Sequence, residues 1–236
     1  MRILVATAVP PERDAVARAF AGPVVEVPLP GTTLHRTGGW DLLAAGVGPA
    51  LAAASTAGAL TAAALSGTPY GLVVCAGIAG GFAPEAPVGS LVVADDITVA
   101  DLGADTADGF VPVTALGFGT VSHRPPNALV REVAAATGAR AGAVLTVSTV
   151  TGTAERAAAL RARHPLAVAE AMEGFGVAEA AAAHGVPVLE LRAVSNPVGP
   201  RDRAAWRIGE AFAALTEAFG KLAPVLESWN PYEPPH

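Results

Sequence analysis

Two glutamates and an asparagine stand out in this sequence because each closely follows a predicted strand. Glu12 follows the apolar run RILVATA, Glu173 follows LAVAEA, and Asn196 follows VPVLELRAVS. A carboxylate can take a proton from water or stabilise a positive charge, and an amide can both donate and accept hydrogen bonds. Brought together, these three groups would suit a hydrolytic reaction with a charged transition state.

Taken alone, each position has an ordinary structural explanation. A glutamate at the start of a helix, such as Glu12 or Glu173, is commonly a partner of the helix dipole. Asn196 precedes Pro197, and this dipeptide commonly opens a turn. The glycines of GVGPA suit a tight turn between a strand and a helix. Only the combination of these positions argues for chemistry.

The elements that must position these residues alternate between strand and helix. Short apolar or β-branched runs bounded by Gly and Pro predict strands, and alanine-rich runs with helical spacing predict helices. We expect strands over 2–8, 24–29, 32–37, 41–47, 71–77, 90–100, 140–148, 166–171 and 186–195, and helices over 11–21, 49–65, from about 127, from about 154, over 174–185 and over about 201–222. This order predicts an α/β fold of three layers with a mixed, largely parallel central sheet. Such sheets bind ligands at the carboxyl ends of their strands, which is where the candidate residues lie.

Three segments are predicted to be irregular. The Gly-rich segment 77–89 separates two strands, and it lacks both the full G-x-G-x-x-G fingerprint and a following helix, so no dinucleotide cofactor is expected. Residues 101–126 lose all periodicity and are expected to form a long surface loop with a functional or interface role. The tail from about residue 228 is Pro-rich.

Length and composition indicate one domain, residues 1–236, that is soluble and cytoplasmic. A chain of 236 residues suits a single α/β domain. Although 52% of the residues are hydrophobic, no run reaches the roughly 18 to 20 apolar residues that span a bilayer. The N-terminal apolar stretch leads into a charged helix start, unlike a signal peptide. The single cysteine, Cys75, cannot form an internal disulfide, which fits a reducing compartment.

The charged residues favour a small molecule as the partner. The formal net charge is −6, and the arginines are scattered, so the basic patch of a nucleic-acid-binding protein is not found. The histidines show neither H-E-x-x-H nor a Cys/His spacing, so no metal site is expected.

Together these segments resemble, in order and spacing across nearly the whole chain, the nucleoside phosphorylase and nucleosidase superfamily. The resemblance is carried by Glu12 after the first strand, by the Met172-Glu173 pair at a helix start, and by RAVSN at the end of a strand. It is closest to the methylthioadenosine/S-adenosylhomocysteine nucleosidases and, within that group, to the futalosine hydrolases of menaquinone biosynthesis. It implies a nucleoside phosphorylase-like fold, a purine nucleoside substrate, release of hypoxanthine from futalosine, no cofactor, and a homo-oligomer that is a dimer or larger.

The resemblance also implies a role for each candidate residue. Glu12 would activate the attacking water, Glu173 would bind the ribose 2′- and 3′-hydroxyls, and Asn196 would address the purine at N7. Cleavage of an N-glycosidic bond creates a ribosyl cation and an electron-rich purine, which these three groups could serve. Further substrate contacts are expected from Met172, packed on the sugar, and from Gly80, Ile78, Thr151 and Phe175, with core packing as the safer interpretation of Phe175.

Two departures from the relatives bear on the base and on the water. Adenine-specific nucleosidases carry an aspartate where this chain has Asn196, and a serine that helps to hold water is replaced by Ile78. An amide cannot protonate N7, but its NH2 can donate to a 6-oxo group while its carbonyl accepts N7–H, which favours hypoxanthine. A rotated amide would suit adenine equally. Without the serine, Glu12 and Arg192 are left to orient the water.

Three alternatives stay open. The first is an adenine-directed nucleosidase acting on methylthioadenosine or aminodeoxyfutalosine. The second is a phosphorylase, although segment 77–89 lacks the arginine and serine that bind phosphate in those relatives and leaves only residues 46–49 as a phosphate candidate. The third is a non-catalytic nucleoside-binding protein, against which the presence of both Glu12 and Glu173 argues.

Overall fold

The computed structural model describes residues 1–230. Its strands are β1 (Ile3–Thr7), β2 (Val25–Leu29), β3 (Thr32–Thr37), β4 (Trp40–Ala44), β5 (Leu72–Gly81), β6 (Leu91–Val99), β7 (Gly103–Thr106), β8 (Gly109–Pro112), β9 (Ser122–His123), β10 (Arg140–Thr146), β11 (Ala167–Ala171) and β12 (Val188–Pro197). Its helices are α1 (Pro10–Ala17), α2 (Pro49–Leu65), α3 (Asn127–Thr137), α4 (Ala154–Arg163), α5 (Gly174–Ala183) and α6 (Ile208–Ser228), with a 3₁₀ turn, η1, at Arg203–Ala205.

The main sheet has the strand order β11-β10-β6-β12-β5-β1-β4-β3-β2. Strands β4, β1, β5 and β12 run parallel to one another, whereas β2 and β3 form an antiparallel edge. Strand β11 pairs with β10 and also with β5, so β5, β12, β6, β10 and β11 close into a ring. The ring brings β11 and β12 to either side of β5. Gly80, Glu173 and Asn196 lie at or just after the ends of these strands, and Glu12 lies in α1, which follows β1.

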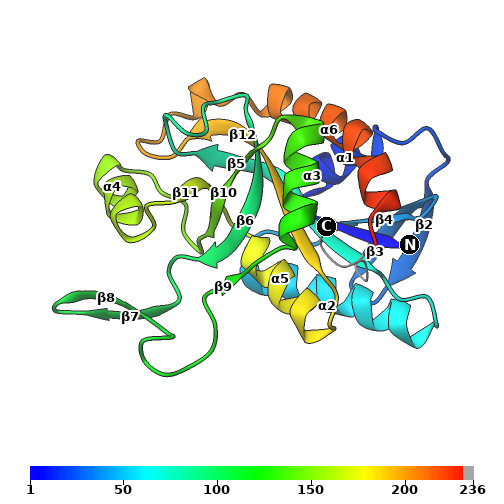
Figure 1. The fold of residues 1–236 in the computed structure, drawn as a ribbon, viewed down its shortest axis with the longest axis horizontal. Helices are drawn as coiled ribbons and strands as arrows, with labels where there is room; N and C mark the ends of the chain where they lie inside the picture. Colours follow the sequence, from blue (N-terminus) through cyan, green and yellow to red (C-terminus); the bar gives the residue numbers. More distant parts are fainter. Residues whose placement is uncertain (231–236) are drawn as a thin grey trace.

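Helices cover both faces of the sheet, as Figure 1 shows. Along β1, Leu4 and Ala6 pack in the cluster under α2 and α5, whereas Ile3 and Val5 pack in the cluster under α1, α3 and α6. Strands buried on both faces read as continuous apolar runs, which is the pattern of β1 and of the first part of β5. The predicted three-layer α/β fold with a mixed sheet is therefore confirmed.

Strand β5 is longer than predicted. The segment expected to be a loop from residue 77 begins as a continuation of β5 to Gly81, because β12 and β11 both pair with it there. Small residues and glycine give a weak strand signal in sequence, but here neighbouring strands supply the backbone partners. A Cβ at Gly81 would lie 2.0 Å from the carbonyl oxygen of Ala86, so only glycine fits.

Segment 101–126 and the last helix also differ from the predictions. Strands β7 and β8 form a hairpin that extends away from the body of the molecule in Figure 1, and β9 pairs with β6, so the segment is not one long loop. Helix α6 begins at Ile208, after η1, and continues to Ser228 with Pro224 inside it, beyond the predicted end near residue 222. Residues 231–236 of the predicted Pro-rich tail lie outside the described residues. Within residues 1–230, no helix combines the length and apolarity needed to cross a bilayer.

Candidate active site

A cavity of about 550 Å³ opens where β1, β5, β11 and β12 end. This volume is in the range of small-molecule sites. Of the residues predicted from the sequence, the cavity wall contains Glu12, Ile78, Gly80, Thr151, Met172, Glu173 and Asn196. The fold therefore brings together seven residues that lie in five separate segments of the chain.

Glu12 lies in the cavity wall, where three backbone N–H groups hold its carboxylate. Its Oε2 accepts from the N–H groups of Ala8 at 2.9 Å and Val9 at 3.2 Å, and its Oε1 accepts from that of Ile78 at 2.8 Å. The side chain is 3% exposed. Burial raises the pKa of Glu12, and the nearby Arg192 guanidinium and the Ile78 N–H offset part of that rise. A fixed carboxylate with a raised pKa is suited to act as a general base.

A glycine allows Glu12 to lie where it does. A Cβ at Gly77 would lie 2.6 Å from Glu12 Oε1 and 2.8 Å from Arg192 Nη1, so a larger residue would displace one of them. The glycine at position 77 is thus explained by packing, because it leaves room for Glu12 and Arg192.

Glu173 immediately precedes α5 and is 5% exposed. Its Oε1 accepts from the backbone N–H of Gly48 at 3.2 Å, and its Oε2 accepts from Arg192 Nη1 at 3.3 Å. Gly48 has a φ of 89°, a conformation that glycine adopts without strain. Residues 46–49 were the candidate for binding phosphate. In the structure, the N–H of Gly48 in this segment donates to the Glu173 carboxylate instead.

Arg192 lies behind the cavity rather than in its wall. It is fully buried on β12 and donates through Nε to Glu190 at 2.8 Å and through Nη2 to the Cys75 sulfur at 3.1 Å, in addition to Glu173. Burial raises the pKa of Glu190, whose Oε2 has no hydrogen-bond partner. The guanidinium of Arg192 is turned toward buried acids and sulfur. This position gives no direct support for the expected role of Arg192 in orienting the water.

The amide of Asn196 is oriented by its neighbours. Ser195 Oγ donates to Oδ1 at 2.9 Å, and Nδ2 donates to the carbonyl oxygen of Pro197 at 3.0 Å. Because a carbonyl oxygen can only accept, the atom that faces Pro197 must be the amide nitrogen. One N–H of Nδ2 and one lone pair of Oδ1 are left for a ligand.

Phe175 does not line the cavity. Its ring is 7% exposed within the core under α2 and α5 and lies 5.4 Å from the ring of His123. The substrate contact expected of Phe175 is thus not among the contacts of this cavity, and the ring packs in the core instead. The backbone N–H of Phe175 donates to Thr146 Oγ1 at 2.8 Å, which holds the first turn of α5.

Several residues of the wall were not predicted from the sequence. They include Glu170 on β11, Val47 and Val150 in loops, and Arg201, Asp202, Arg203 and Trp206 between β12 and α6. Glu170 lies three residues before Glu173 on the strand that leads to the predicted helix. Its place near the end of that strand could have identified it as a candidate. The segment 201–206 gave no such signal because it was predicted to be part of a helix.

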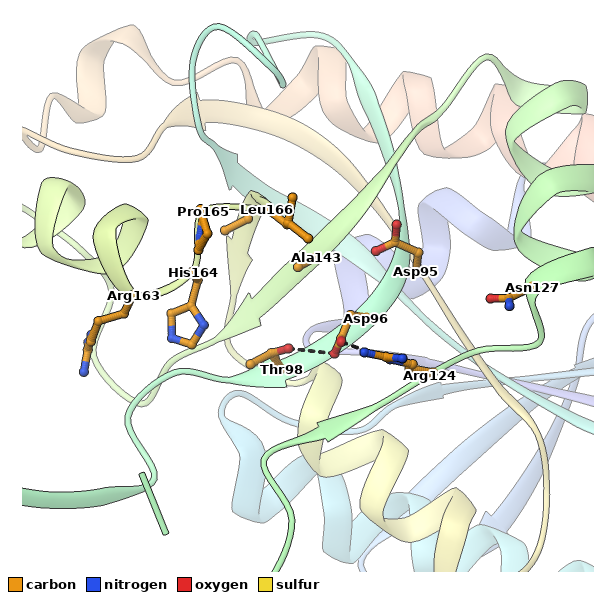
Figure 2. Close-up of a pocket in the computed structure, with 11 residues that line it drawn as sticks. Asp95, Asp96, Thr98, Arg124, Asn127, Ala143, Arg163, His164, Pro165 and Leu166 are labelled. Atoms are coloured by element: carbon orange, nitrogen blue, oxygen red, sulfur yellow. Dashed lines mark hydrogen bonds and ion pairs between the residues drawn. The ribbon is translucent and has the colours of Figure 1, made fainter. Parts of the chain in front are cut away.

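A second pocket of about 420 Å³, drawn in Figure 2, lies beside β6 and β10 and is also lined by residues 163–167. In it, Asp96 accepts hydrogen bonds from Thr98 at 2.7 Å and Arg124 at 3.4 Å. None of the candidate residues is among the described residues that line this pocket. In the part of the chain that the structure describes, no three His, Cys, Asp or Glu residues are grouped to hold a metal ion.

Comparison with known proteins gives consistent matches over nearly the whole chain. The sequence profile of the phosphorylase superfamily matches residues 2–226. The chain is 80% identical over 234 residues to a futalosine hydrolase of Streptomyces coelicolor, covering 99% of this chain and 100% of that protein. It is 47% identical to a futalosine hydrolase of Acidothermus cellulolyticus, covering 93% and 89% of the two chains.

A solved structure confirms the predicted nucleoside phosphorylase-like fold. The native futalosine hydrolase of Helicobacter pylori superposes with a TM-score of 0.79, covering 95% of this chain and 98% of that chain. The sequence identity of this pair is 17%, so the match concerns the fold.

Proposed function

Because the chain belongs to the phosphorylase superfamily and, within it, to the futalosine hydrolases, we propose that it hydrolyses futalosine to hypoxanthine and dehypoxanthine futalosine. The observation that carries this proposal is the convergence of Glu12, Glu173 and Asn196 on one cavity. Two carboxylates and one oriented amide meet the three demands of N-glycosidic hydrolysis, which are a base for water, an anion near the sugar and a partner for the purine.

Glu12 takes the proton from the attacking water. Three backbone N–H groups fix the position of its carboxylate, and fixed geometry of this kind lowers the entropic cost of attack. Oxygen from water forms a bond to C1′ of the ribose, and the electron pair of the C1′–N9 bond passes into the purine. The proton removed from water resides on Glu12 until it returns to solvent.

Glu173 binds the ribose 2′- and 3′-hydroxyls and faces the developing cation. Its contacts with Gly48 and Arg192 leave lone pairs on both oxygens for the two hydroxyls. Arg192 acts through Glu173 in this proposal, as a positioning residue. Met172, which lies beside Glu173 in the cavity wall, packs on the sugar.

Asn196 receives the departing base. Its free N–H donates to O6, where negative charge accumulates as the bond breaks, and Oδ1 accepts N7–H once a proton from solvent has reached N7. The bonds from Ser195 and to Pro197 hold the amide in this orientation, which supports hypoxanthine over adenine.

Water rather than phosphate is the nucleophile in this proposal. The N–H of Gly48 is taken by Glu173, and the carboxylates of Glu12 and Glu173 in the cavity wall would repel a phosphate. The family membership further supports a place in menaquinone biosynthesis, in the cytoplasm.

We also propose a homo-oligomer, a dimer or larger. The β7–β8 hairpin stands away from the body, and Leu102, Leu116 and Phe118 near it are 43%, 44% and 69% exposed. Light scattering on the purified chain tests this point, because a monomeric mass at working concentration would contradict it.

A substrate panel tests the proposed activity. The chain is incubated without phosphate with futalosine, inosine or methylthioadenosine, and the released base is separated by chromatography. We expect hypoxanthine from futalosine at the highest rate. Faster release of adenine from methylthioadenosine would favour the adenine-directed alternative.

A further inference from the structure

Glu170 is a buried carboxylate in the wall of the cavity to which the proposed mechanism gives no role. It lies on β11 and is 6% exposed. Thr151 holds it with two hydrogen bonds, from the backbone N–H to Oε1 at 2.7 Å and from Oγ1 to Oε2 at 2.5 Å. A carboxylate this buried is costly unless it is well partnered, so its place beside a ligand cavity calls for an explanation.

The strand register relates Glu170 to Asn196. Gly80 on β5 is paired with Glu170 of β11 on one side and with Asn196 of β12 on the other. Because neighbouring strands lie about 4.8 Å apart, the backbones of Glu170 and Asn196 are separated by roughly two such spacings, with Gly80 between them. All three residues line the same cavity.

Gly80 lies between the strands that carry Glu170 and Asn196 and places no side chain beside the Asn196 amide. A Cβ at this position would lie 2.9 Å from Val198 Cγ2 and 3.3 Å from Asn196 Nδ2. A flat ring over Gly80 would therefore meet a carboxylate at one side and an amide at the other.

The carboxylate has capacity to accept more hydrogen bonds. An ionised carboxylate offers about four lone-pair positions, and Thr151 occupies one on each oxygen. Because Thr151 fixes both oxygens, the remaining lone pairs are preorganised acceptors for a donor in the cavity.

We propose that Glu170 accepts the N1–H of a 6-oxopurine and so makes the site selective for 6-oxo over 6-amino bases, an inference that rests on the proposed function for placing a purine in this cavity. Along one edge of hypoxanthine, N7, O6 and N1 follow one another. Asn196 meets the first two, and Glu170 meets the third. Thr151 acts through Glu170, as a positioning residue.

The chemistry of the two bases explains the selectivity. In hypoxanthine N1 carries a hydrogen and donates, whereas in adenine N1 is an acceptor. Burial raises the pKa of Glu170, and the two hydrogen bonds from Thr151 offset part of that rise. When Glu170 is ionised, adenine would place its N1 lone pair against the lone pairs of the carboxylate. A site that meets a polar edge with the wrong partner can reject it by several powers of ten, because buried groups are left unpaired or repelled. The oriented amide of Asn196 contacts only N7 and O6, so Glu170 adds a further point of discrimination at N1.

The substitution Glu170→Gln tests the inference. It keeps the size of the side chain, and the Thr151 hydroxyl can reverse to accept from the new NH2. The values of kcat/KM are measured for futalosine and for its 6-amino analogue, which shares the same 5′ side. Because a hydrogen bond to a charged group is lost, we expect the value for futalosine to fall about 10- to 100-fold, with that for the 6-amino analogue unchanged or raised. Glu217→Gln, at an exposed position of α6, is the matched control.

Binding of the free bases gives a second readout that does not need turnover. Calorimetry with hypoxanthine and adenine is carried out on the parent chain, on Glu170→Gln and on Glu170→Asp, which keeps the charge if the glutamine variant does not fold. Selective weakening of hypoxanthine binding in the variants supports the inference. An equal loss for both bases would show that Glu170 only holds the loop at Thr151, and no hypoxanthine binding to the parent would also overturn it. Failure of the parent to cleave futalosine, with selective base binding intact, would count against the proposed function alone.

Discussion

The backbone N–H of Ile78 donates a hydrogen bond of 2.8 Å to Oε1 of Glu12. The residue whose side chain departs from the pattern of the relatives thus contributes through its backbone. Strand β5 continues through Ile78, and its pairing with Ala193 fixes the direction of this N–H. An isoleucine side chain in place of the relatives' serine changes the lining of the cavity. The hydrogen bond from the backbone N–H to Glu12 does not depend on the side chain and is kept.

Glu12→Gln is expected to lower turnover of futalosine by about 10² to 10⁴-fold, the usual cost of losing a general base. Binding should change little, because the amide has the size of the carboxylate. The checks are kcat from hypoxanthine release and the dissociation constant from calorimetry. Asp14→Asn, on the exposed side of the same helix, is the control. Near-normal turnover would remove Glu12 from the mechanism.

The pH dependence of kcat/KM should show the raised pKa of Glu12. The base must be ionised to accept a proton, so activity is present above its pKa and is lost as the pH falls through it. Because burial raises the pKa, we expect the acid limb at a higher pH than the value of about 4.3 for an ordinary glutamate. A profile that stays flat down to that value would contradict the assignment.

Glu173→Ala should impair both binding and rate, because it removes an acceptor for two hydroxyls and an anion near the cation. It also leaves Arg192 with one carboxylate partner fewer, so the thermal unfolding temperature must be measured beside the kinetics. In the parent chain, 2′-deoxyfutalosine should be a poor substrate. If the deoxy and ribo forms were cleaved equally well, the role of Glu173 would be misassigned.

Asn196→Asp should raise the ratio of adenine to hypoxanthine release, most strongly toward low pH. An ionised aspartate would face the O6 lone pairs, whereas a protonated one could donate to N7 of adenine and accept from its 6-amino group. The ratio is measured with futalosine and its 6-amino analogue over a pH series. A ratio that does not move would show that Asn196 does not contact the purine edge.

The sequence predicted most elements of the fold, because strands buried on both faces and alanine-rich helices leave clear local patterns. Helix α2 has the predicted bounds. The extension of β5 to Gly81 was missed because it depends on β11, which pairs with β5 across more than 80 residues of chain. The β7–β8 hairpin was missed because its strands are four residues long, none of their residues is buried, and they have no apolar alternation.

The candidate site divides in the same way. Glu12, Glu173 and Asn196 could be chosen because their order and spacing together resemble a known superfamily and each lies near the end of a predicted strand. The structure brings all three to one cavity. The position of Arg192 behind Glu173 could not be predicted, because the face of a strand that a side chain occupies depends on its partners. The hydrogen bonds from Thr151 to Glu170 join a residue in a loop to a residue on β11. Their spacing in the sequence does not predict this contact.

The most direct test of the central claim compares hypoxanthine release from futalosine without phosphate and with phosphate in the millimolar range, with identification of the sugar product by mass spectrometry. Hydrolysis by water activated at Glu12 predicts equal rates in the two conditions and dehypoxanthine futalosine with a free anomeric hydroxyl. Acceleration by phosphate together with a sugar 1-phosphate product would contradict the account.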